Sequence, residues 1–76
     1  MKELLTHIVK NLVTEPDAIA ITESVQGDTV TFELRVAQAD MGRVIGRHGR
    51  IAKEIRTLMK AAGNRENMKV SVDICD

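Results

Sequence analysis

The sequence predicts a small α+β domain with the element order α-β-β-α-α-β, in which helices cover one face of a three-stranded sheet. Apolar residues recur with helical spacing over residues 4–13 and again over residues 51–62. Apolar and polar residues alternate over residues 30–36 and 69–74, which is the pattern of half-buried strands. Because its 76 residues contain no internal repeat or linker, the chain is expected to form one domain, residues 1–76.

The first half of the chain is predicted to form a helix and a β-hairpin. The apolar stripe of the helix consists of Leu4, Leu5, Ile8, Val9, Leu12 and Val13. Pro16 is expected to stop this helix, because proline lacks a backbone N–H and disfavours helical geometry in the preceding residue. Ile19 and Ile21 mark the first strand, residues 30–36 form the second, and Gln26-Gly27-Asp28-Thr29 is the turn between them.

The second half is predicted to form two helices and a final strand. Asp40 is expected to cap a short helix over Met41–Ile45, and a longer helix begins near Arg50. Gly63-Asn64 is expected to end that helix by adopting a left-handed backbone. The last strand covers residues 69–74.

Composition excludes several classes of protein. The one cysteine, Cys75, rules out a disulfide framework and a cysteine-based zinc site. No apolar run approaches the ~20 residues of a membrane span, so we expect a cytoplasmic protein with no membrane association. His7, His48 and Cys75 have no neighbours in sequence that would make them a base or a nucleophile. We therefore expect no enzymatic activity, no metal, no cofactor and no small-molecule substrate.

Positive charge is concentrated in one quarter of the chain. Residues 42–60 hold six lysines and arginines against Glu54 alone, a net charge of +5, whereas residues 1–41 carry −4. The local field, rather than the net charge of zero, attracts a polyanion. A solvated helix face would also explain such a run, so the interpretation depends on the motif that it contains.

That motif is Gly46-Arg47-His48-Gly49, which joins the two predicted helices. Two glycines three residues apart permit a tight turn, and the next helix begins with unpaired N–H groups at the positive end of its dipole. Such a junction suits a phosphate group, although the same glycines would also serve a plain helix–helix corner. The candidate binding residues are Arg43, Val44, Ile45, Gly46, Arg47, His48, Gly49, Arg50, Ile51 and Lys53. The glycine spacing fits neither a P-loop nor a dinucleotide-binding loop.

In its wider context, this V-I-G-x-x-G-x-I stretch resembles the KH-domain signature, whose loop clamps a nucleic-acid backbone. The Glu15-Pro16-Asp17-Ala18 corner and the run from Asp40 to Gly46 are also similar to the bacterial single-KH proteins of the KhpA family. The resemblance covers essentially the whole chain and implies a type II KH fold. The resemblance also implies that residues 46–49 form the RNA clamp. The groove for the bases would then be bordered by Leu34, Val36, Val44, Ile45 and Ile51.

The resemblance further implies a cytoplasmic protein that binds single-stranded RNA with little sequence preference. It implies a homodimer, or a heterodimer with a larger KhpB/Jag-type KH protein, and a post-transcriptional role linked to cell division and cell-wall elongation. KhpA-like loops often carry lysine where this chain has His48, so the charge there is partial near neutral pH. RNA affinity is therefore predicted to rise modestly from pH 8 to pH 6.

Phe32 is the only aromatic residue and falls on the apolar face of a predicted strand, so it is expected in the core. Base stacking on aromatic rings is then excluded, and single-site RNA binding should be weak. The alternative function is a protein–protein adaptor that keeps the KH shape and presents Met41, Val44, Ile45 or Met59 to a partner. The +5 segment favours RNA binding, because an adaptor has no need of cations beside the loop.

Overall fold

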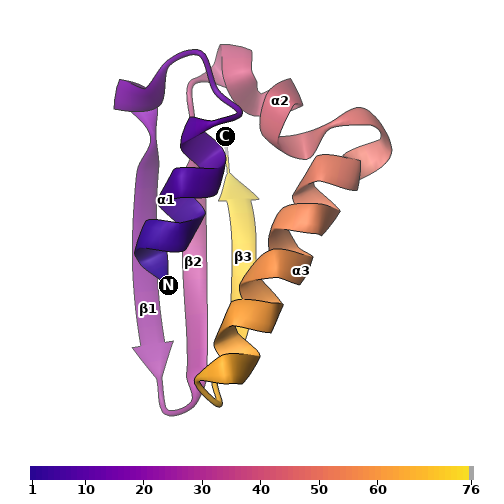
Figure 1. The fold of residues 1–76 in the computed structure, drawn as a ribbon. Helices are drawn as coiled ribbons and strands as arrows, with labels where there is room; N and C mark the ends of the chain where they lie inside the picture. Colours follow the sequence, from indigo (N-terminus) through magenta and orange to yellow (C-terminus); the bar gives the residue numbers. More distant parts are fainter. Residues whose placement is uncertain (76) are drawn as a thin grey trace.

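A computed structural model of the chain describes residues 1–75. Helices and strands follow the predicted order, with three short 3₁₀ turns between them (Figure 1). The helices are α1 (Lys2–Lys10), α2 (Met41–Ile45) and α3 (Arg50–Arg65), the strands are β1 (Ala20–Gln26), β2 (Thr29–Arg35) and β3 (Lys69–Cys75), and the 3₁₀ turns are η1 (Pro16–Ala18), η2 (Gln38–Asp40) and η3 (Arg47–Gly49).

The three strands form one sheet in the order β1-β2-β3. β2 lies in the centre, antiparallel to β1 and parallel to β3. The helices lie on one face of this sheet, with α1 over β1 and β2, α3 alongside β3, and α2 at one end (Figure 1). The predicted α+β fold class is confirmed.

The core lies between the sheet and the helices. The central strand supplies Val30, Phe32 and Leu34, which are almost completely buried. Phe32 has no exposed surface, so the only aromatic ring belongs to the core as predicted. From the helices, Leu5 and Met59 pack against the same cluster. The alternation of the strand sequence therefore reflects one buried and one solvated face.

Helix α1 ends at Lys10, six residues before Pro16, so the prediction that proline stops it is wrong. The N–H of Asn11 donates to the Ile8 carbonyl oxygen at 3.3 Å and that of Leu12 to the Val9 carbonyl oxygen at 2.9 Å; both bonds span three residues, so the last turn is tighter than an α-helix. Pro16 instead opens the 3₁₀ turn η1.

The end of α3 also differs from the prediction. The helix continues through Gly63 and Asn64 to Arg65, and the left-handed residue is Asn67, with φ 58°. Gly63 is buried against β3: a Cβ there would overlap Val70 Cγ2 and lie 2.8 Å from the carbonyl oxygen of Met68. Gly63 therefore allows α3 and β3 to approach each other closely, and it does not terminate the helix.

Candidate nucleic-acid interface

The loop between α2 and α3 has an unusual backbone. Gly46 has φ 75° and ψ 174°, His48 has φ 57° and Gly49 has φ 72°. Three of the four residues in the Gly46-Arg47-His48-Gly49 loop thus lie at positive φ, where side chains other than those of glycine, asparagine and aspartate are rare. The sequence GxxG is therefore required by the backbone itself.

Gly46 is also required by packing. A Cβ at this position would lie 2.8 Å from Ile51 Cβ and 2.9 Å from the Ile51 backbone nitrogen. The loop therefore folds directly onto the first turn of α3. Around Gly49, by contrast, a Cβ would meet nothing within 4 Å, so that side of the loop is open.

The loop satisfies only part of its own hydrogen bonding. The N–H of Gly46 donates to the Gly42 carbonyl oxygen at 2.9 Å, and the N–H of Gly49 donates to the Gly46 carbonyl oxygen at 3.2 Å. Arg47 and His48 open the 3₁₀ turn η3, and the first N–H groups of a helix have no acceptor within that helix. Both residues are exposed, so these amides can donate to an external acceptor such as a phosphate oxygen.

The cationic side chains predicted for the site surround this loop and point to solvent. Arg43, Arg47, His48, Arg50 and Lys53 are all exposed. In the described part of the chain the ion pairs are those of the N-terminus with Glu3 and of Arg43 with Asp40. Arg47, Arg50 and Lys53 consequently carry charges that no carboxylate within 4 Å compensates.

Arg56, a sixth cation of the +5 segment, has a different role. Its Nε donates to the Val72 carbonyl oxygen of β3 at 3.1 Å. β3 is an edge strand, so this bond satisfies a carbonyl group that has no neighbouring strand to pair with. The free cations of the interface are thus fewer than the charge count indicates.

The apolar floor is smaller than predicted. Ile45 is 38% exposed and Ile51 is half-buried, so these two offer aliphatic surface beside the loop. Val44, Leu34 and Val36 are buried in the core and present almost no surface to a ligand. The reason is that α2 turns Val44 into the core and Ile45 toward solvent.

Sequence reasoning missed the most heavily bonded side chain near the site, that of Asp40. It occupies the predicted cap position of α2 but makes no cap hydrogen bond. Its carboxylate is fully buried and accepts hydrogen bonds from the Thr14 N–H (3.1 Å), the Thr14 hydroxyl (2.9 Å) and the Glu15 N–H (3.1 Å). The bond from the Thr14 N–H is the largest influence that holds the pKa of Asp40 below its ordinary value, against burial, which raises it. Because 26 residues separate the partners, no local pattern could reveal the contact.

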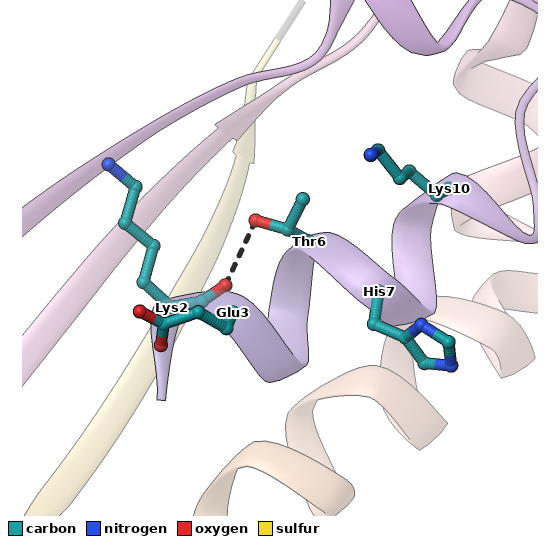
Figure 2. A pocket seen from close by; sticks show the side chains of 5 residues that line it. All are labelled: Lys2, Glu3, Thr6, His7 and Lys10. Atoms are coloured by element: carbon teal, nitrogen blue, oxygen red, sulfur yellow. Dashed lines mark hydrogen bonds between the residues drawn. The ribbon is translucent and has the colours of Figure 1, made fainter.

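The outer surface of α1 is shallowly hollowed, away from the GxxG loop. Figure 2 shows that Lys2 and Lys10 extend to one side of the helix while His7 projects to the other. The Thr6 hydroxyl donates to the Lys2 carbonyl oxygen at 3.0 Å, within the same helix. These side chains do not converge on a common point, and His7 is an exposed helix residue.

Residues 1–75 contain neither a cluster of potential metal ligands nor a long apolar helix. No three histidine, cysteine, aspartate or glutamate side chains gather closely enough there to hold a metal ion. The same residues include no helix with the length and apolar character needed to cross a membrane.

The helices over a three-stranded sheet and the GxxG loop between α2 and α3 define a domain of the KH class. Residues 2–74 match the family described as KhpA/KhpB, KH domain. The RNA-binding protein KhpA of Clostridium acetobutylicum is 50% identical over 74 residues, which are 97% of this chain and 99% of that protein. The RNA-binding protein KhpA of Chlamydia trachomatis is 45% identical over 76 residues, covering 100% of this chain and 97% of that protein. The Listeria monocytogenes protein of the same name is 45% identical over 76 residues, with 100% of both chains covered. The chain therefore belongs to the KhpA/KhpB KH-domain family, as its sequence resemblance indicated.

Proposed function

We propose that this protein binds single-stranded RNA as a single KH domain spanning residues 1–76, without catalytic activity. The observation that carries the proposal is the GxxG loop, where the exposed residues Arg47 and His48 open a 3₁₀ turn beside uncompensated cations. Relatives of the same length and up to 50% identity are RNA-binding proteins by name, which supports the same ligand here.

In this mechanism the RNA backbone lies on residues 46–49, where the free amides and the Arg47 and Arg50 side chains contact phosphate oxygens. Such contacts carry little sequence information, so low sequence preference follows. The bases lie over Ile45 and Ile51, which offer aliphatic contact and no stacking surface, so the affinity of one domain is modest. If about four phosphates are contacted, the logarithm of the RNA association constant should fall linearly with the logarithm of the salt concentration. The slope should be about −3, since each phosphate of a single strand contributes ~0.7.

The proposal is tested by fluorescence anisotropy with a labelled single-stranded RNA at two salt concentrations. The variant is Arg47→Asp/His48→Asp, because aspartate tolerates the left-handed backbone of residue 48. The matched control is Lys2→Glu/Lys10→Glu, which also replaces two cations by acids, on exposed positions of α1. Circular dichroism verifies that both remain folded.

Salt-sensitive binding that the loop variant loses and the α1 variant keeps is the expected result. Equal loss in both variants would mean that net charge alone attracts the RNA, and that residues 46–49 are no clamp. Absence of binding by the unmodified protein would reject the proposed function.

Weak single-site affinity favours two linked domains, because a second site raises avidity without new contacts. We therefore also propose that the protein acts in the cytoplasm as a homodimer or with a KhpB/Jag-type KH protein, in post-transcriptional control of growth and division. The adaptor alternative has less support from the structure. Of its four residues, Val44 and Met59 are fully buried, Met41 is half-buried, and Ile45 is the exposed one.

A further inference from the structure

The buried carboxylate of Asp40 joins two parts of the chain at the edge of the interface. Its oxygen atoms accept three hydrogen bonds from Thr14 and Glu15, in the corner between α1 and β1. On the other side, Asp40 Oδ1 lies 3.6 Å from Nε of Arg43, one turn further along α2. Only 1% of the Asp40 side chain is exposed, whereas 59% of the Arg43 side chain is exposed.

The geometry of this pair leaves part of the guanidinium free. The closest contact of the guanidinium with the carboxylate is an ion pair through Nε, and within residues 1–75 its two Nη groups have no hydrogen bond or ion pair of their own. Those groups are the fork that binds a phosphate in bidentate fashion. A long arginine side chain free in solvent would lose rotamer entropy on binding, and an anchored one loses less.

We propose that Asp40 is a positioning residue for RNA binding, which holds Arg43 by its Nε side and presents the Nη fork to the RNA backbone beside residues 46–49. The inference rests on the proposed RNA-binding function. The expected effect is opposite to simple charge repulsion. A negative charge near the binding site for a polyanion ordinarily repels the ligand, whereas removal of the Asp40 charge is expected to weaken RNA binding.

Asp40→Asn tests whether the Asp40 charge strengthens or weakens RNA binding, because the substitution removes the charge with little change of shape. We expect the RNA dissociation constant to rise about three- to tenfold, as the anchored arginine becomes mobile. The matched control is Glu54→Gln, which removes the one acid of residues 42–60, on an exposed position of α3. This variant should bind RNA equally well or more tightly, since it only relieves repulsion. Tighter binding by Asp40→Asn as well would overturn the inference.

A double-mutant cycle with Arg43→Gln separates positioning from general support of the fold. If Asp40 acts through Arg43, Asp40→Asn has no further effect on RNA affinity once residue 43 is glutamine. An undiminished effect in that background would mean that Asp40 acts through the α1–β1 corner instead, and the inference would fail.

A second measurement does not require Asp40→Asn to fold. In the unmodified, RNA-free protein, ¹⁵N relaxation should show that the Nε–H group of Arg43 is more ordered than that of Arg47, because an ion pair holds the Arg43 side chain. Equal disorder of the two groups would refute the anchoring. RNA binding that survives Asp40→Asn unchanged rejects this inference alone, whereas no RNA binding by the unmodified protein rejects the proposed function together with it.

Discussion

Replacing the glycines of α2 and the loop one at a time by alanine should change stability in three different ways. At Gly49 the added Cβ has free space, and only the left-handed backbone of φ 72° opposes it, at a cost of about 1–2 kcal/mol. At Gly46, φ 75° with ψ 174° belongs to a region that only glycine occupies readily. The strain of about 1–3 kcal/mol adds to overpacking of a similar size against Ile51, so we expect a loss of about 3 kcal/mol or more.

Gly42 provides the matched control. It lies inside α2, is exposed, and a Cβ there would meet nothing within 4 Å. Because alanine loses less backbone entropy than glycine on folding, Gly42→Ala should stabilise the protein by about 0.5–1 kcal/mol. The same substitution thus reverses its effect within a stretch of eight residues, Gly42 to Gly49.

Urea unfolding followed by circular dichroism measures these differences, since the chain has no tryptophan or tyrosine. With a slope of about 1 kcal/mol per molar urea for so small a domain, the midpoint should fall about 1–2 M for Gly49→Ala and about 3 M for Gly46→Ala. It should rise by less than about 1 M for Gly42→Ala. Equal stability of the Gly46 and Gly49 variants would refute the close contact with Ile51.

Two more predictions concern packing and acid stability. Gly63→Ala should lower the free energy of unfolding measured in urea by about 1–3 kcal/mol, because the added Cβ overlaps Val70, and this outweighs the better helix propensity of alanine. Val70→Ala in the same chain should recover part of this loss. If the losses of the two single variants simply add in the double variant, the overlap is refuted. The hydrogen bonds that Asp40 accepts lower its pKa in the folded state, so its contribution is present above the ordinary aspartate pKa of about 3.9 and lost as pH falls through the lower folded value. Thermal midpoints measured from pH 6 to pH 2 should therefore decline less steeply for Asp40→Asn than for the unmodified protein, and parallel curves would speak against it.

Features encoded by local pattern were predictable from the sequence. The order of elements, the bounds of α2, the turn at Gly27-Asp28 and the buried position of Phe32 all appear in the structure as expected. Each depends on periodicity or turn chemistry within a few residues. The glycines of the loop belong to the same group, because the need for positive φ is a property of the backbone at that residue.

Features that depend on contact between distant residues were not predictable. Gly63 resembles a helix terminator in sequence, and only the position of β3 shows that it admits a neighbouring strand. Arg56 resembles any other cation on the basic face, yet it is bonded to the Val72 carbonyl oxygen. Val44 and Ile45 are adjacent and similar, and only the orientation of α2 decides which is buried and which borders the loop.

The sequence by itself determined the KH architecture, the GxxG loop and the concentration of cations around it, since periodicity, glycine spacing and charge act over short stretches of chain. Tertiary structure decided which of these residues remain available to a ligand. It placed Thr14 and Glu15 against Asp40 across about 25 residues of sequence, with Arg43 paired to the same carboxylate. Hydrogen bonds between such distant partners depend on how helices and sheet pack, and packing brings together residues whose local sequences carry no sign of each other.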